Sequence, residues 1–216
     1  SSRHRVPPEQ KTCLFLHFLE NEDKKLARNM SNATFHIRPA LFSDRPRIEV
    51  LRIAANPNAK SASSEGDWFD RCLKRHERDS RWGCFLVVEI NGTVEGYGAV
   101  GWWSPDLEEN SPKNAIPAGY ILSGTWVEPA HRRKGIGLAL AAKRLEWIRQ
   151  RSKEAWYWTD HDNIASQKLH ERLGFEHYSD DFWFAPRNRP GCYLYRLFWE
   201  DQAQRIPDPP DPGTRT

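Results

Sequence analysis

The chain has 216 residues, 38% of them hydrophobic and 28% charged, which suits one folded domain and excludes a wholly disordered protein. Its formal net charge of +3 is too even a balance to indicate nucleic acid as the main partner. Its apolar runs, such as residues 85–88, are far shorter than the roughly 20 residues that a transmembrane helix needs.

The two ends of the chain lack the pattern of a packed core. Residues 1–34 are polar and carry no strand pattern, so we expect an N-terminal extension that is helical over residues 13–28. Residues 201–216 are rich in proline and predict a flexible tail. The domain itself is expected over residues 35–200.

The domain alternates between strand and helix signals. Strands are predicted at 35–39, 84–90, 93–103, 119–127, 155–159, 175–184 and 193–199. Helices are predicted at 44–56, 67–79, 135–152 and 164–173. Asn91-Gly92 is typical of a tight hairpin turn, and Asp44 and Asp67 are placed to cap the first two helices. This order predicts an α/β fold in which helices flank a mixed sheet.

The most informative segment lies where the strand at 119–127 passes into the next helix. Gly135 and Gly137 let the backbone approach a bulky anion closely, and the N–H groups at the helix start point at it. Positive charge is added by Arg132, Arg133 and Lys134. The segment therefore predicts a binding site for a pyrophosphate, although it matches neither the dinucleotide fingerprint nor the Walker loop.

Two motifs in this order resemble those of the GNAT family of N-acetyltransferases. Residues 132–137 read R-R-K-G-I-G and follow V-E-P at 127–129, which is similar to the family's acyl-CoA-binding motif. Residues 163–175 are similar to the family's helix-to-strand element N-x-x-[AS]-x-x-[LF]-Y-x-x-x-G-F. The resemblance covers about residues 35–199. Within it, L-H-E-R-L-G at 169–174 looks like the sequence motif found at this point in phosphinothricin acetyltransferases.

The resemblance implies a fold, a reaction and a set of binding residues. The fold would be a mixed, mostly antiparallel sheet of six to seven strands with about four helices and a splayed strand pair at the cofactor site. The reaction would be direct acetyl transfer from acetyl-CoA to an amine, with coenzyme A as product. The residues implied to bind the cofactor are Thr125, Trp126, Val127, Arg132, Arg133, Lys134, Gly135, Ile136, Gly137, Leu138, Asn163 and Ser166.

The catalytic positions depart from the family pattern. Many members have Tyr where this chain has His170, whose imidazole can also protonate a leaving thiolate, unless His170 only packs against the cofactor. Some members have a Glu base where this chain has Trp158, so we expect the base to be Glu89 or Asp160. Glu128, Asp162 or a chain of waters could take the proton in their place.

The acceptor site is expected near the loop at 104–117. Trp102, Trp103 and Asp106 combine aromatic and acidic groups that suit a cationic substrate, although a solubilising loop over a core has the same composition. We expect acetylation of the primary amine of a small molecule, such as an aminoglycoside-like antibiotic. Protein N-termini or lysines are a second class of acceptor, and a sensor that binds acyl-CoA without turnover is a third hypothesis.

Location and partners are inferred from what the sequence lacks. No secretory signal is visible and the four cysteines lack metal-ligand spacing, so we expect a cytoplasmic protein with free thiols and no metal. We expect no nucleic-acid or membrane partner. Homodimers are common in the family that the chain resembles.

Overall fold

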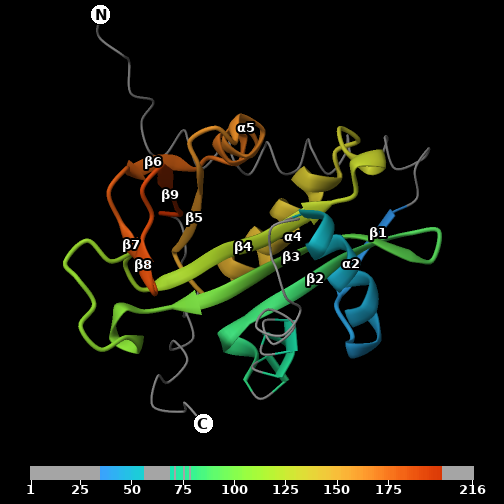
Figure 1. The fold of residues 1–216 in the computed structure, drawn as a ribbon, viewed down its shortest axis with the longest axis horizontal. Coiled ribbons are helices and arrows are strands. Elements are labelled where there is room, and N and C mark those ends of the chain that lie inside the picture. The colour runs from blue at the N-terminus through green and yellow to red at the C-terminus, as the bar shows by residue number, and fades with distance from the viewer. Residues whose placement is uncertain (1–34, 56–68, 71, 75, 78, 201–216) are drawn as a thin grey trace, which may run out of the picture.

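A computed structural model describes residues 35–55, 69–70, 72–74, 76–77 and 79–200. A seven-stranded sheet runs through them in the order β1-β2-β3-β4-β5-β9-β6 (Figure 1). Its strands are β1 (Phe35–Pro39), β2 (Gly83–Ile90), β3 (Thr93–Trp103), β4 (Gly119–Val127), β5 (Glu154–Asp160), β6 (Glu176–Ser179) and β9 (Cys192–Phe198). Only β4 and β5 pair in parallel within this sheet, so the mixed, mostly antiparallel architecture is confirmed.

Helices cover both faces of the sheet (Figure 1). On one face, α2 (Arg45–Ala55) and a helix within residues 69–77 pack apolar side chains such as Ile48 and Phe69 against β2 and β3. On the other face lie α4 (Ile136–Arg149) and α5 (Ile164–Arg172). No helix among the described residues is long and apolar enough to span a membrane.

The strands bury alternate side chains on the two faces, as the period of a strand requires. Tyr120 and Leu122 of β4 join the core beneath α4, whereas Ile121 joins a cluster on the opposite face. That cluster is largely aromatic and consists of Trp103, Ile116, Ile121, Trp156, Phe182, Cys192 and Leu194. The sheet therefore has a core on each face, and a ligand that passes between two strands would contact both.

Several local predictions are confirmed and two need correction. Asn91 and Gly92 have φ angles of 50° and 78°, which is the hairpin turn expected from the sequence. The predicted strand at 175–184 is wrong in its length, because the chain turns after Ser179. Its remainder forms β7 (Trp183–Phe184), which pairs with β8 (Arg187–Asn188) in a separate small sheet.

The predicted cap at Asp44 is the second correction. Its carboxylate does not accept from the first turn of α2, because it accepts from the backbone N–H of Leu41 at 2.8 Å and from both terminal nitrogens of Arg38. The expected helix at 13–28, the cap at Asp67 and the tail at 201–216 lie outside the described residues.

Candidate active site

The sheet opens between β4 and β5. The two strands pair at three positions, the last of which joins Leu122 to Tyr157. Both continue beyond that pair, β4 to Val127 and β5 to Asp160, so the facing edges of the described strands diverge. Backbone N–H and C=O groups without a strand partner then line the gap, and a ligand with amides of its own can bind them. The splayed strand pair implied by the family resemblance is present.

A bulge on β4 lies at the start of the gap. Gly98 of β3 faces two residues of β4, Gly124 and Thr125, because the register shifts between Tyr97 and Ala99. Gly124 has a φ of 54°, in the left-handed region that favours glycine. A bulge of this kind re-aims backbone groups away from the regular ladder. The strand edge expected to bind the pantetheine arm is therefore irregular where the gap begins.

The start of α4 presents free backbone donors. Gly135 is the N-cap residue with a φ of 83°, and the first bond within the helix runs from the N–H of Ala139 to the carbonyl of Gly135 at 3.0 Å. The N–H groups of Ile136, Gly137 and Leu138 therefore have no acceptor inside the helix. A Cβ atom at Gly135 would meet nothing within 4 Å, so the space before the helix is open.

The basic residues of this turn divide into two roles. Arg132 donates from Nε to the carbonyl of Val127 at 2.8 Å, and its guanidinium lies 4.2 Å from the centre of the Trp126 ring. Arg132 therefore fastens the turn to the end of β4. Arg133 and Lys134 are exposed beside the free N–H groups. Three backbone donors and two exposed cations fit a diphosphate in both charge and hydrogen-bonding capacity.

The N-terminal turn of α5 comes directly after β5 and holds two predicted cofactor residues together. Asn163 caps the helix by accepting from the backbone N–H of Ser166 at 3.2 Å. The Ser166 hydroxyl in turn accepts from the phenol of Tyr157 at 2.5 Å. The helix start is thereby linked to Tyr157, the last residue of β5 that pairs with β4. We call this point, where the two strands separate, the apex of the gap.

His170 is buried one turn further along α5. Its Nδ1 lies 2.9 Å from the carbonyl of Ser166, which can only accept, so Nδ1 carries the proton. Burial lowers the pKa of His170 to about 3, so the ring is neutral at physiological pH. Nε2 is then an unprotonated acceptor, and within the described residues it has no hydrogen-bond partner. The acid role predicted for His170 would require a change of tautomer or a charged ring.

Tyr157 was not recognised as a candidate from the sequence. Its ring stacks on His170 with centroids 3.5 Å apart, and burial raises the pKa of its phenol to about 12. The phenol therefore keeps its proton at neutral pH. No local sequence signal marks this residue, because its position at the apex depends on where β4 and β5 separate.

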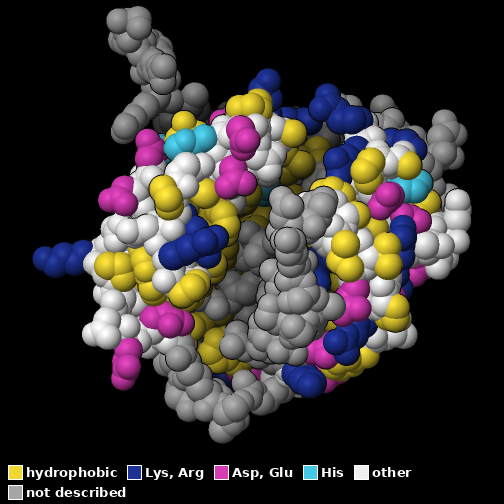
Figure 2. All heavy atoms as spheres, in the orientation of Figure 1, with side chains coloured by type: hydrophobic (Ala, Val, Ile, Leu, Met, Phe, Trp, Pro, Cys, Tyr) yellow, Lys and Arg dark blue, Asp and Glu magenta, His cyan; other side chains and the backbone are white. Residues whose placement is uncertain are grey.

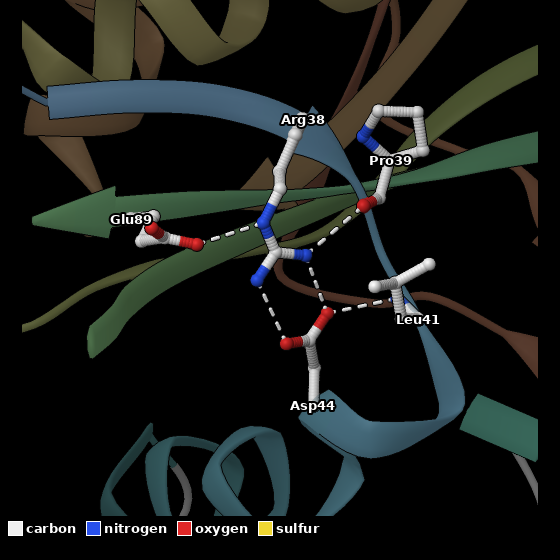
Figure 3. Close-up of polar contacts among 5 residues, drawn as sticks. All are labelled: Arg38, Pro39, Leu41, Asp44 and Glu89. Atoms are coloured by element: carbon white, nitrogen blue, oxygen red, sulfur yellow. Dashed lines mark hydrogen bonds and ion pairs between the residues drawn. The ribbon is translucent and has the colours of Figure 1, made fainter. Parts of the chain in front are cut away.

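The two predicted bases lie in different parts of the sheet. Glu89 of β2 accepts from Arg38 at 2.8 Å, and the same guanidinium binds Asp44, so Glu89 belongs to an ion-pair network that joins β1, β2 and the start of α2 (Figure 3). Two strands separate β2 from β5. Asp160 is exposed at the end of β5 that borders the gap, where it accepts from the thiol of Cys192 at 3.2 Å.

The predicted substrate residues are not brought together. Trp102 packs edge-on against Tyr120 beneath α4, whereas Trp103 lies on the opposite face and donates its indole N–H to the carbonyl of Ile116 at 3.1 Å. Consecutive residues of a strand point to opposite faces, which explains the separation. Asp106 is exposed in a short 3₁₀ turn and accepts from the hydroxyl of Ser104.

A different set of side chains lines the gap on the α2 face. Trp158 is the first residue of β5 after the last pair with β4, and its half-buried ring packs near Phe184 of the β7–β8 hairpin. The guanidinium of Arg189 lies 4.9 Å from the centre of the Trp158 ring. In Figure 2 hydrophobic side chains gather on this face over the C-terminal half of the chain.

Comparison with known proteins gives a family match. Residues 38–175 match the model of the Acetyltransferase (GNAT) family, which is more than half of the chain. A methionine sulfoximine and methionine sulfone acetyltransferase from Salmonella typhimurium is 33% identical over 92 residues, which cover 42% of this chain and 48% of the relative. The chain thus spans about half the length of that relative. It spans 36% of the length of a second relative, a mycothiol acetyltransferase from Salinispora arenicola.

Solved structures with the same fold cover most of the chain. A phosphinothricin acetyltransferase from Sinorhizobium meliloti, in complex with acetyl-CoA, has a TM-score of 0.59 at 18% identity and covers 81% of this chain and 94% of its own. A ribosomal-protein-alanine N-acetyltransferase from Brucella melitensis has a TM-score of 0.56 at 24% identity and covers 76% and 99%. These likenesses confirm the fold expected from the sequence.

Proposed function

Because the chain belongs to the GNAT family of acetyltransferases, we propose that it transfers an acetyl group from acetyl-CoA to the primary amine of a small molecule. The observation that carries the proposal is the presence of two features together. One is the set of free N–H groups at the start of α4, and the other is the gap that begins where β4 leaves β5. When bound, acetyl-CoA supplies the acetyl thioester. The chain holds it, orients it and moves the protons.

The side chains and backbone groups on the α4 face are suited to hold the coenzyme. The N–H groups of residues 136–138, with Arg133 and Lys134, would bind the diphosphate. The free edge of β4 at residues 125–127 would pair with the amides of the pantetheine arm. Asn163 and Ser166 lie across the gap at the start of α5, where they would face the end of that arm.

The acceptor would approach from the α2 face. With the coenzyme on the α4 face, the opening through the sheet leaves the opposite side for the amine. Trp158 and Phe184 provide aromatic surface there, with Arg189 beside them. Aromatic surface beside a gap of this kind suits a compact amine better than an extended peptide, which needs an open groove.

Two groups at the gap are placed to move protons. The leaving sulfur must gain a proton, and we assign its donor to the phenol of Tyr157 because that O–H group lies at the apex of the gap, whereas the role predicted for His170 would need a proton on Nε2. The attacking amine must lose a proton, and Asp160 is the predicted base that borders the gap. Asp160 would release that proton to solvent, and Tyr157 would regain one from solvent.

The names of two similar proteins indicate which acceptors to test first. The Salmonella relative is named for amino-acid derivatives, so small amino acids are the first amines to test, followed by aminoglycosides. The Brucella neighbour is named for a ribosomal protein, which keeps peptides as the second candidate acceptor. Homodimerisation and a cytoplasmic location stay predictions.

Thiol release from acetyl-CoA, measured with separate panels of amino acids, aminoglycosides and short peptides, tests the proposal. We expect release above background with at least one small amine and the N-acetylated product by mass spectrometry. Release only with peptides would replace the acceptor class. Binding of acetyl-CoA in calorimetry without release for any amine would favour a sensor instead of an enzyme.

A further inference from the structure

Arg144 is a charged residue inside the core. It lies on α4 between Ala141 and Leu145, which belong to the apolar side of the helix, and its exposed fraction is 0%. Among the described residues no carboxylate pairs with it, and its Nη2 atom has no hydrogen-bond partner. Burial lowers the pKa of Arg144 to about 10, so the guanidinium is still charged at neutral pH. A buried cation without a counterion is costly for folding and calls for an explanation.

The guanidinium lies directly beneath the bulge of β4. Nη1 donates to the carbonyl of Ala99 on β3 at 3.2 Å and to the carbonyl of Ser123 on β4 at 3.4 Å. These two residues are the last regular pair before the bulge. Ser123 is also the first residue of β4 beyond its last pair with β5. The cation therefore lies at the point where the bulge and the gap begin.

The strand opposite the bulge makes room for this side chain. A Cβ atom at Gly98 would lie 3.0 Å from the Cζ atom of Arg144, closer than nearly all real contacts of this kind. Gly98 is the residue that faces Gly124 and Thr125 across the bulge. The absence of a side chain at Gly98 and the presence of Arg144 thus belong to one arrangement, which sets the path of β4 as it enters the gap.

We propose that Arg144 is a positioning residue for acetyl transfer. It holds the carbonyl of Ser123 inward, so that the backbone of β4 after Ser123 faces the gap. Its positive charge also favours the negative charge that develops on the thioester carbonyl during the reaction. This inference rests on the proposed function, because it requires that acetyl-CoA bind with its thioester carbonyl at the bulge. The guanidinium acts from behind the strand, through Ser123, and makes no contact with the acceptor. Because neutral carbonyls are its only partners among the described residues, no carboxylate cancels its field.

The charge of Arg144 also acts on other buried groups on the α4 face of the sheet. Burial is the main cause of the low pKa of His170, and the charge of Arg144 lowers it further. In the same way burial raises the pKa of Cys84 to about 12, and the charge of Arg144 opposes that rise. A cation that acts on other buried groups on this face will also act on a thioester carbonyl placed at the bulge.

The test combines four variants with a spectroscopic readout. Arg144→Met removes the charge at similar length, and Arg144→Lys keeps it. Gly98→Ala pushes on the guanidinium without changing the charge, and Gly101→Ala is its matched control on the same strand, where a Cβ would meet nothing within 4 Å. For each folded variant, the infrared stretch of the thioester carbonyl is measured in bound ¹³C-labelled acetyl-CoA, together with kcat and KM.

In the wild-type protein we expect the carbonyl stretch to lie at a lower frequency than in water. Arg144→Met should return the stretch toward its value in water and lower kcat about 10- to 100-fold, with KM for acetyl-CoA changed less than about threefold. Arg144→Lys should recover most of both effects. Gly98→Ala should give an intermediate frequency, and Gly101→Ala should match the wild type.

Two results would overturn the inference. One is an unchanged frequency and kcat in Arg144→Met. The other is a loss in Arg144→Lys as large as in Arg144→Met, which would indicate a purely structural role. If Arg144→Met does not fold, Gly98→Ala against Gly101→Ala decides, since equal frequencies in these two would also refute it. A wild-type protein that binds acetyl-CoA with a shifted stretch but acetylates no amine would count against the proposed function and leave the frequency comparison intact.

Discussion

The imidazole of His170 lies parallel to the phenol ring of Tyr157, with ring centroids 3.5 Å apart and planes inclined by 10°. The stack joins α5 to the last residue of β5 that pairs with β4. It places one buried group that stays neutral and one that stays protonated at the apex of the gap. The two residues therefore act as a unit, and replacing either one tests the site in a different way.

His170→Phe should change how the stability of the protein depends on pH. The pKa of His170 is about 3 in the folded state, well below the value of about 6.5 for an exposed imidazole, so the unfolded chain binds the extra proton first. The wild type should therefore lose stability relative to His170→Phe as the pH falls from about 7 to about 4, by at most about 1.4 kcal/mol per pH unit. Urea unfolding of both proteins at about pH 7.5 and about pH 4.5, on either side of the ordinary imidazole pKa, measures this. A difference in stability that does not change with pH would mean that the imidazole titrates normally.

Tyr157→Phe should lower the rate of acetyl transfer and leave binding of the coenzyme nearly unchanged. The substitution removes the phenolic proton and keeps the ring that stacks on His170. We expect kcat to fall about 10- to 100-fold, since general acid catalysis contributes roughly 10²–10⁴-fold in typical enzymes and water can partly replace it. Tyr195→Phe is the matched control, because Tyr195 is buried near Tyr157 on β9. Equal rates for the two variants would exclude Tyr157 as the donor.

Gly135→Ala should weaken binding of coenzyme A about 10-fold, because a residue with a side chain is strained at a φ of 83° and its Cβ would occupy the space before the helix. Gly92→Ala provides the control. Gly92 has a φ of 78° and a Cβ there would also meet nothing within 4 Å, but it lies at the tip of the β2–β3 hairpin. Calorimetry should therefore detect weaker binding in Gly135→Ala alone. Similar losses in both variants would point to general destabilisation.

Asp160→Asn and Glu89→Gln should separate the two predicted bases. Asp160 borders the gap, so its loss should lower kcat about 10-fold or more at neutral pH. Glu89 pairs with Arg38, so Glu89→Gln should keep kcat within about twofold and lower the free energy of unfolding by about 0.5–1 kcal/mol. Values of kcat at neutral pH and urea unfolding of each variant distinguish the outcomes. A larger loss of kcat in Glu89→Gln than in Asp160→Asn would assign the role of general base to Glu89 on β2.

The features that we propose to bind the coenzyme could be predicted from the sequence because they are local. Glycines at 135 and 137, followed by a helical pattern, specify free N–H groups at a helix start whatever the rest of the chain does. The hairpin at Asn91-Gly92 is local in the same sense, since two positive φ values are needed between the strands. Each of these features depends on a few neighbouring residues, so the sequence pattern was sufficient to predict it.

The catalytic groups depend instead on where strands distant in sequence pair and separate. Tyr157 stands at the apex only because β5 leaves β4 after Leu122, and Glu89 is removed from the gap by two intervening strands. Trp102 and Trp103 were expected together, yet the sheet divides them because neighbouring strand residues face opposite sides. Local patterning thus determined the free N–H groups and the cations at the helix start, whereas long-range strand pairing decided which phenol, which carboxylate and which buried cation lie beside the gap between β4 and β5.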